Sequence, residues 1–313
     1  MSKEKLKKIG ILGTDKRVYN FLLKGDKYGD LRKEQRFIDF AVLCNKMLDN
    51  DSEARKRNLK LRTYAIVPLS RNTGLIEWIQ NTSTLKSVVG DYWKKNNIKG
   101  EMQEIKKKAH EAGQGDTHTQ IWGKVKEDIK PVLGSWFADH FSSPEIWYEA
   151  RINFVRSTAI WSMIGYVIGL GDRHGDNILI HQHTGEVTHV DFDCIFEKSA
   201  KLKIPEIVPF RLTINIMDAF GIFKEKGVYQ KSCEVVLRVL RKNQSNIVSF
   251  LYSFIHDPLI EATQNIKVEI VDALEVVKKK LAGQISIEMG DGGALTIEEQ
   301  VEQEFEEAFF LQQ

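Results

Sequence analysis

The sequence predicts an α+β fold with two lobes: a small β-rich lobe at the N-terminus and a larger, mostly helical lobe after it. Short apolar segments separated by turn formers occupy most of residues 1–79, with one amphipathic helix among them. From about Trp136 onward, apolar residues recur at helical spacing nearly to the end, with one hairpin pattern between them. A length of 313 residues is sufficient for two lobes that each bury a core.

The first lobe is expected to begin with a β-hairpin. Residues 9–12 and 18–23 are rich in apolar side chains and flank the turn formers Gly-Thr-Asp. A helix is expected from Leu31, because the apolar side chains that follow it fall on one helical face. Two short β-rich segments, at 61–69 and 74–79, complete the lobe.

The second lobe is expected to be built from helices around one hairpin. Residues 85–127 are polar and lysine-rich, with a Gly-Gln-Gly break that is expected to be a loop. The lysines near 94–108 are interpreted as a solvated helix face, not a DNA-binding patch. An apolar helix is predicted over 151–170, followed by strands at 177–181 and 186–192. Amphipathic helices are predicted at 212–220, 232–241, 247–255 and 266–282.

Composition limits the classes of function. Lys and Arg number 45 against 43 Asp and Glu, so the formal charge is +2 and no global field draws the chain to nucleic acid or an acidic membrane. The three cysteines are widely spaced, which favours reduced thiols over a disulfide framework. The N-terminus has no apolar segment typical of a signal peptide, and the longest apolar run, 159–170, is too short to span a bilayer.

The polar residues that carry chemistry lie in the sequence GDRHGDNILI, residues 171–180. This loop places Asp172, His174 and Asn177 between a predicted buried helix and a predicted buried strand. Asp191, in HVDFD, ends the second strand of the hairpin. Because the hairpin returns close to its starting loop, Asp191 is expected to face Asp172 and Asn177.

This set of side chains suits phosphoryl transfer. That reaction needs a carboxylate beside the attacking hydroxyl and hard oxygen ligands that hold Mg²⁺ against the phosphates. The protein-kinase catalytic loop separates its base Asp from its metal-binding Asn by four residues, and Asp172 and Asn177 keep that spacing. The order here is Asp-Arg-His instead of His-Arg-Asp. The structural alternative is that these residues only cap the loop and its turns.

The combined motifs resemble those of the phosphatidylinositol 3-kinase-related protein kinases. GLGDRHGDNILI, HVDFD and IPEIVPFRLT are similar to the catalytic and activation loops of that family, and RSTAIWSMIGYVIGLGDRHGDN and GEVTHVDFDCIF are most similar to its ATR branch. The resemblance covers about residues 9–260. It implies a bilobal protein-kinase-like fold of the type found in phosphatidylinositol 3- and 4-kinases, and transfer of the γ-phosphate of ATP to Ser or Thr hydroxyls.

The resemblance also implies roles for single residues. Asp172 would orient or deprotonate the substrate hydroxyl, and His174 would stabilise charge on the transferring phosphoryl group. Asn177 and Asp191 would ligate Mg²⁺, with Mn²⁺ as an alternative.

The nucleotide-binding residues implied by the resemblance come from both lobes. Lys24 would hold the α- and β-phosphates, and Glu34 would position that lysine. The purine pocket would consist of the aromatic residues Tyr64 and Trp78, the hinge residue Ile79 and the floor residues Leu179 and Val190.

The resemblance divides the chain into three parts: an N-lobe at 1–79, a C-lobe at 80–285 and a partial FATC-like segment at 294–313. The phosphate-covering loop of the family would fall at residues 1–8, and the ending lacks the family's tryptophan. The family's long helical scaffold is not in the sequence either, which suggests a fragment of a longer kinase. Asp193 replaces the glycine of the DFG-like triplet, so flipping of this segment is expected to be restricted.

Two alternatives remain open at this point: a phosphatidylinositol 3- or 4-kinase that acts on lipid, and a catalytically impaired pseudokinase fragment. Residues 197–209 contain only three lysines, offset by two glutamates, which favours a protein substrate over a polyanionic headgroup. The resemblance alone implies Ser/Thr-Gln substrate sites, a nuclear role in DNA-damage and replication-stress checkpoints, and an ATR-interacting adaptor bound through regions absent here. No membrane association and no direct DNA contact are expected.

Overall fold

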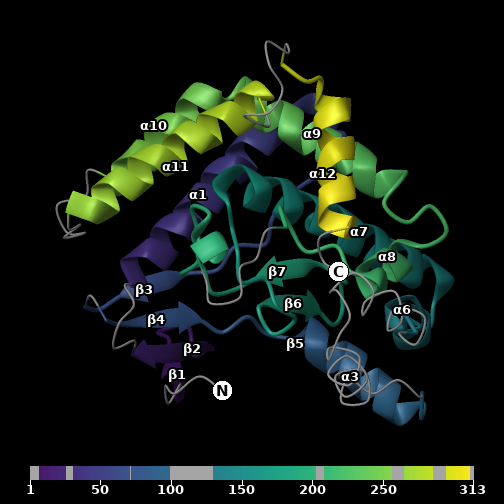
Figure 1. Cartoon of the computed structure of the whole chain (residues 1–313). Helices are drawn as coiled ribbons and strands as arrows, with labels where there is room; N and C mark the ends of the chain where they lie inside the picture. The colour runs from purple at the N-terminus through teal and green to yellow at the C-terminus, as the bar shows by residue number, and fades with distance from the viewer. Residues whose placement is uncertain are drawn as a thin grey trace, which may run out of the picture.

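A computed structural model shows a small lobe of strands beside a larger lobe of helices (Figure 1). The β-strands β1 to β4 lie together at one side, the helices that follow residue 130 occupy most of the other, and a short second sheet lies between them. The structure describes residues 7–25, 31–70, 72–98, 130–201, 208–255, 264–284 and 294–310. The predicted α+β fold with two unequal lobes is confirmed.

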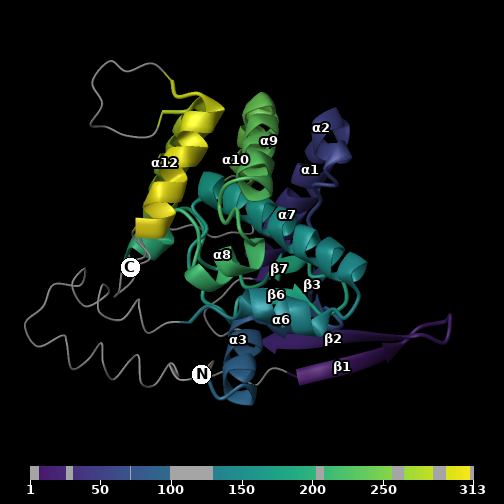
Figure 2. The same ribbon diagram turned by 90° about the vertical axis from the view of Figure 1, so that its right-hand side faces the viewer.

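The first lobe contains an antiparallel sheet of four strands in the order β1-β2-β4-β3. The predicted hairpin is present, and its turn is closed by the Gly13 N–H, which donates to the Arg17 carbonyl at 2.8 Å. Figure 2 shows this hairpin extending away from the helices. The strands are β1 (Lys7–Leu12), β2 (Val18–Gly25), β3 (Ile66–Pro68) and β4 (Thr73–Glu77).

Helix α1 (Leu31–Asn50) covers this sheet with the face that the apolar spacing predicts. Phe37 and Phe40 are each 1% exposed, so the helix is held mainly by burial of its apolar face. The Asn45 side chain exchanges hydrogen bonds with the backbone of Leu61, at 2.9 and 2.8 Å. These bonds fix the segment that enters β3 against the helix.

A charged contact joins the two lobes behind α1. Asp51 caps α2 (Ser52–Lys56) by accepting hydrogen bonds from the Glu53 and Ala54 N–H groups. It also binds the Arg238 guanidinium with both oxygens, at 2.9 Å each. The hydrogen bonds from Arg238 lower the pKa of Asp51 to about 2. Arg238 belongs to α9 (Val228–Lys242), so this pair connects the first lobe to the second.

We expect Asp51→Ala to lower the free energy of unfolding by about 2 kcal/mol, because it removes a helix cap and one partner of a two-bond ion pair. Urea unfolding of the variant would measure this. Asp49→Ala is the matched control, since Asp49 is exposed near the end of α1, and it is expected to stay within about 0.5 kcal/mol of the wild type. Equal losses in the two variants would contradict the prediction.

The second lobe surrounds a three-stranded antiparallel sheet in the order β5-β6-β7. Strands β6 (Ile178–His181) and β7 (Val187–His189) form the predicted hairpin, and β5 (Thr82–Thr84) pairs with β6. The Gly-Gln-Gly break expected within 85–127 falls at residues 113–115, outside the described part of the chain. Residues Leu85–Lys95 form helix α3, capped by Thr84 and held by buried Leu85, Val88 and Trp93; residues 99–129 lie outside the described part of the chain.

The central helix of the molecule is α7 (Pro144–Ile168). Every residue from 157 to 168 is buried, because the β5-β6-β7 sheet, α9 and the C-terminal helices pack around it (Figures 1 and 2). The helix ends at Gly169, whose φ of 62° is the left-handed conformation expected of a C-terminal cap. The catalytic-loop sequence therefore begins at the end of the most deeply buried element.

The other elements of the second lobe are α6 (Leu133–His140), the 3₁₀ helix η1 (Lys198–Lys201), α8 (Ile214–Phe220), α10 (Gln244–Ile255), α11 (Gln264–Ala282) and α12 (Ile297–Phe310). The helices predicted at 212–220, 232–241, 247–255 and 266–282 correspond to α8 to α11. Among the described residues, no helix combines the length and the apolar character that crossing a membrane requires.

Candidate active site

The catalytic-loop sequence lies between the end of α7 and the start of β6, and it folds around Asn177. The Asn177 Nδ2 donates to the Asp172 carbonyl at 2.9 Å and lies 3.5 Å from Asp172 Oδ2. The His174 Nε2 is 3.9 Å from Asp172 Oδ1. The side chains of Asp172 and His174 are 45% and 51% exposed, so a substrate hydroxyl can reach both.

Asp191 follows β7, and the hairpin brings it back to this loop. The Val190 N–H donates to the Asn177 carbonyl at 3.1 Å, which joins the end of the hairpin to the catalytic loop through the backbone. The structure therefore brings Asp172, Asn177 and Asp191 to one place, as the hairpin length predicted. Their chemical roles stay predictions.

Two of these residues adopt a strained backbone. Asp172 has a φ of 59° and Asp191 a φ of 62°, the left-handed region that favours glycine. Asp193, which stands in the glycine position of the DFG-like triplet, does not have a positive φ. The aspartate at that position is therefore accommodated without backbone strain, and the strain lies at the two aspartates of the site instead.

A second cluster forms around Lys24, across from the catalytic loop. Lys24 on β2 makes a close ion pair with Glu34 on α1, and Glu34 is 2% exposed. Carboxylate oxygens of Glu34, Asp191 and Asp193 lie within 4.8 Å of one another. Burial raises the pKa of Glu34 to about 7. The negative charges of Asp193 and Asp191 also raise it, and the attraction to Lys24 lowers it only in part. Burial lowers the pKa of Lys24, but attraction to Glu34 outweighs it and the net shift is upward.

We expect Glu34 to make the nucleotide-free protein less stable as pH rises from about 5 to about 7. The folded-state pKa of about 7 exceeds the ordinary value of 4.5, so the folded protein holds this proton more tightly than the unfolded chain. The contribution is complete below pH 4.5 and is lost as pH rises toward 7. Urea unfolding should show the wild type losing about 2 kcal/mol more than Glu34→Gln over that range. Parallel curves for the two proteins would contradict this.

The residues predicted for a purine pocket occupy different surroundings. Tyr64 is 6% exposed, and burial raises its pKa well above the usual range, with further increase from the nearby charge of Glu34. Trp78 is 40% exposed, and Lys8 Nζ lies 4.4 Å from the centre of its ring. Among the described residues, the rings of Tyr64 and Trp78 do not pack on each other. Tyr64 thus belongs to the back of the acidic cluster, and Trp78 is partly exposed with Lys8 over its ring.

Ile79 follows Trp78 in the segment that joins the two sheets. Its carbonyl accepts a hydrogen bond from the Thr82 hydroxyl at 2.9 Å. Within the described residues its N–H donates to no protein group, which leaves a backbone donor for a ligand. Leu179 and Val190 are half-buried, on β6 and just after β7 respectively, so they lie on the sheet that borders the catalytic loop.

Asp193 was predicted to affect only the backbone of its segment. Its carboxylate joins the cluster with Glu34 and Asp191 and adds negative charge where Lys24 lies. The second aspartate in HVDFD was the only sign of this role in the sequence. The direction of its side chain depends on the fold of the segment.

Comparison with protein families gives a match over residues 19–264 to the model described as phosphatidylinositol 3- and 4-kinase. The chain belongs to this family. The match covers both lobes, and it contains every predicted site residue from Lys24 to Asp191.

Curated relatives in this kinase family include the serine/threonine-protein kinase MEC1 of Candida albicans, 38% identical over 98% of this chain and 13% of its own length. The protein kinase rad3 of Schizosaccharomyces pombe is 38% identical over 96% of this chain. The serine/threonine-protein kinase ATR of Arabidopsis thaliana is 38% identical over 85% of this chain and 10% of its own length. These relatives confirm the predicted resemblance to ATR-type kinases. The chain spans about 13% of the length of the first of them.

Solved structures agree on the fold of this kinase-family member. The open conformation of CtTel1 matches 97% of this chain with a TM-score of 0.85 and 34% sequence identity, and the match covers 11% of that protein. The FAT and kinase domain of CtTel1 matches equally well, over 22% of that chain.

Membership in a kinase family implies ATP and a divalent cation, and the site has the groups to hold them. Because Asn177 Nδ2 is bonded to Asp172, the orientation of the amide is set and its oxygen remains as an acceptor. Asp191 adds a carboxylate. Hard oxygen donors of this kind suit Mg²⁺, and a cation would relieve the repulsion among the carboxylates of the cluster.

Proposed function

We propose that this chain is the catalytic module of an ATR-type serine/threonine protein kinase, which transfers the γ-phosphate of ATP to Ser or Thr hydroxyls of proteins. The observation that carries the proposal is that the end of β7, with Asp191, returns to the loop that holds Asp172 and Asn177, with the Lys24–Glu34 pair across from them. The 38% identity to MEC1 and rad3 over nearly the whole chain supports the protein-kinase class.

Nucleotide binding is assigned to the first lobe and the segment after it. Lys24 would bind the α- and β-phosphates, with Glu34 holding its ammonium in place, as their ion pair supports. The partly exposed ring of Trp78 would stack on the adenine ring, and the N–H of Ile79, which has no acceptor among the described residues, would donate a hydrogen bond to it. Tyr64, Leu179 and Val190 would complete the walls of that pocket.

The chemical step is assigned to Asp172 and His174. Asp172 would orient the substrate hydroxyl and accept its proton, because its carboxylate is exposed and held by the loop. His174, 3.9 Å from Asp172, would stabilise charge on the transferring phosphoryl group. Asn177 and Asp191 would hold Mg²⁺, or Mn²⁺ in its place. A bound cation supplies charge neutralisation at the phosphates.

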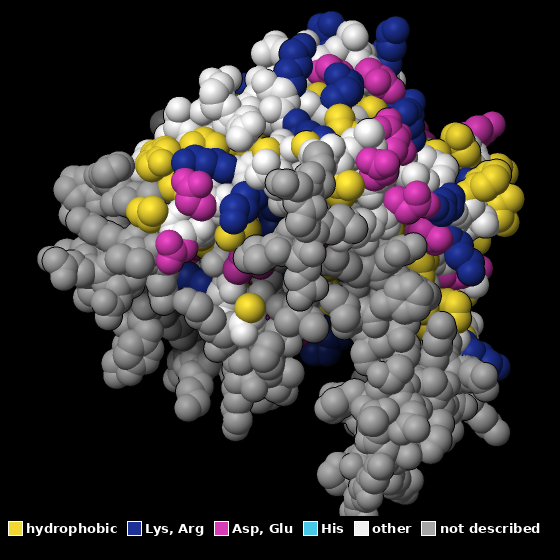
Figure 3. Space-filling model, turned by 45° about the horizontal axis from the view of Figure 1, so that its top comes forward, with side chains coloured by type: hydrophobic (Ala, Val, Ile, Leu, Met, Phe, Trp, Pro, Cys, Tyr) yellow, Lys and Arg dark blue, Asp and Glu magenta, His cyan; other side chains and the backbone are white. Residues whose placement is uncertain are grey.

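A protein substrate is favoured over a lipid. A phosphoinositide headgroup needs a basic cluster near the site. Among the coloured residues on the face in Figure 3, Lys and Arg side chains are interspersed with Asp and Glu. The segment after HVDFD, residues 197–209, contains only three lysines and also two glutamates. Preference for Ser/Thr followed by Gln is proposed from family likeness alone.

The cellular setting follows from the same likeness. We propose a nuclear role in checkpoint signalling after DNA damage or replication stress, with an adaptor bound through regions outside this chain. The division into an N-lobe at 1–79, a C-lobe at 80–285 and a FATC-like segment at 294–313 is part of this proposal. Helix α12, which begins at Ile297, falls in the last of these parts.

The test is a steady-state assay of the purified chain with Mg-ATP, a Ser-Gln peptide and phosphatidylinositol vesicles as separate acceptors. Phosphorylation of the peptide, lost when Ser is replaced by Ala, is the expected result. Phosphorylation of the lipid but not the peptide would establish a lipid kinase. Nucleotide binding without transfer to either acceptor would establish a pseudokinase.

A further inference from the structure

Arg173 connects the two aspartates of the candidate site through the backbone. It lies between Asp172 and His174 in the sequence, yet its side chain is buried and the residue is 6% exposed. Its guanidinium donates three hydrogen bonds, all to main-chain carbonyls. Nε donates to Gly171 at 2.9 Å, Nη1 donates to Val190 at 2.9 Å, and Nη2 donates to Asp191.

These three carbonyls flank the strained residues. The Gly171 carbonyl belongs to the peptide before Asp172, and the carbonyls of Val190 and Asp191 belong to the peptides on either side of Asp191. A left-handed conformation costs a non-glycine residue about 1 to 2 kcal/mol, so it persists only where neighbouring groups hold it. By fixing these peptide planes, the guanidinium of Arg173 fixes the directions in which both carboxylates project.

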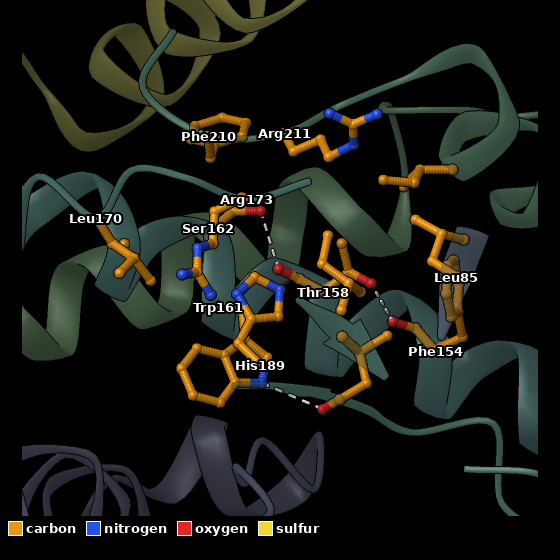
Figure 4. Close-up of a pocket in the computed structure, with 14 residues that line it drawn as sticks. Leu85, Phe154, Thr158, Trp161, Ser162, Leu170, Arg173, His189, Phe210 and Arg211 are labelled. Atoms are coloured by element: carbon orange, nitrogen blue, oxygen red, sulfur yellow. Dashed lines mark hydrogen bonds between the residues drawn. The ribbon is translucent and has the colours of Figure 1, made fainter. Parts of the chain in front are cut away.

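The surroundings of Arg173 favour a rigid clamp. Figure 4 shows its guanidinium beside the His189 ring, which stacks on Trp161 at 4.6 Å between ring centres. The Phe192 ring lies 5.6 Å from the guanidinium carbon on another side. The cavity at this place is only about 20 Å³, enough for about one water molecule. Hydrogen bonds shielded from water in this way are stronger and better fixed in direction.

We propose that Arg173 is a positioning residue that holds Asp172 and Asp191 in their left-handed conformations, and so sets the placement of the hydroxyl-orienting group relative to the metal-holding group. This inference rests on the proposed function of the same site. Lysine cannot replace arginine here, because an ammonium is a single point donor and cannot reach three carbonyls in a planar fork. Charge alone is therefore insufficient for the role.

The test compares Arg173→Lys, which keeps the charge, with Arg173→Gln, which loses it. Both are expected to lower kcat for the Ser-Gln peptide by about 100-fold, the cost of a small misplacement of reacting groups. Both are expected to raise the Mg²⁺ concentration at half-maximal activity by about 10-fold, as for residues that orient metal ligands. The KM for ATP is expected to change by less than about threefold, because Lys24 and the purine pocket are untouched.

A second measurement does not require activity. The Mg²⁺-dependent thermal stabilisation by a non-hydrolysable ATP analogue should need about 10-fold more Mg²⁺ in both variants. If the wild type shows this stabilisation but phosphorylates no peptide, the proposed function fails while the role of Arg173 can still be tested. Arg238→Lys is the control, because it breaks the two-bond pair of a half-exposed arginine that joins α9 to Asp51 and should leave the Mg²⁺ dependence unchanged.

Wild-type Mg²⁺ dependence and kcat in Arg173→Lys would overturn the proposal, since charge would then suffice. Equal changes in Arg238→Lys would also overturn it, because they would reflect general loss of stability. If neither Arg173 variant folds, Arg173 is a structural residue and the proposal is wrong.

Discussion

Asp172→Ala is expected to reduce kcat for a Ser-Gln peptide by about 1,000-fold while the affinity for ATP changes by less than about twofold. A positioned acid or base typically contributes between about 100-fold and 10,000-fold. Asp172 is placed to act at the substrate hydroxyl, and its carboxylate is 45% exposed beside His174. The phosphate-binding lysine and the purine pocket lie on other elements. Peptide phosphorylation and ATP-analogue binding, measured on the same preparation, check this result.

The matched control is Asp176→Ala in the same loop. Asp176 pairs with Lys86 at 2.5 Å on the outer side of the loop, so its removal deletes a carboxylate without touching the site. We expect its kcat to stay within about threefold of the wild type, since exposed ion pairs contribute little. If Asp172→Ala retains wild-type turnover, or if Asp176→Ala loses as much, the assignment of Asp172 is wrong.

Most of the fold could be predicted because the apolar spacing of each element agrees with its burial. The helix from Leu31 and the hairpin after Asn177 are examples in which periodicity, turns and burial agree. The bounds of helix α3 were not predicted, because lysines dominate its exposed face and only a solvated helix face near 94–108 was expected. Its buried side chains at Leu85, Val88 and Trp93 were the signal, together with the capping residue Thr84.

The site was less accessible to sequence analysis. Spacing placed Asp172, Asn177 and Asp191 together, since they share one loop and one hairpin. The closeness of Glu34 to Asp191 and Asp193 depends on how the two lobes meet, which no local pattern records. The left-handed backbone at Asp172 was also beyond prediction, because aspartate rarely adopts it and only tertiary contacts hold it there.

Asp191→Ala is expected to abolish the part of nucleotide binding that depends on Mg²⁺. In the wild type, an ATP analogue at 100 times its Kd should stabilise the folded state by about 2.7 kcal/mol with Mg²⁺ present. In the variant, the thermal shift with Mg²⁺ should equal the shift without it, because the carboxylate that would hold the cation is gone. Thermal unfolding of both proteins, with and without Mg²⁺, measures this difference without any need for catalysis.

The melting temperature of the nucleotide-free variant, measured in the same experiment, separates loss of stability from loss of the metal site. The charge of Asp191 raises the pKa of buried Glu34, so Glu34 should ionise at lower pH in the variant. Asp139→Ala, on the exposed face of α6, should retain the full Mg²⁺-dependent shift. An undiminished Mg²⁺-dependent shift in Asp191→Ala would show that Asp191 does not hold the cation, so the assignment of Asp191 and Asn177 as a ligand pair would be wrong.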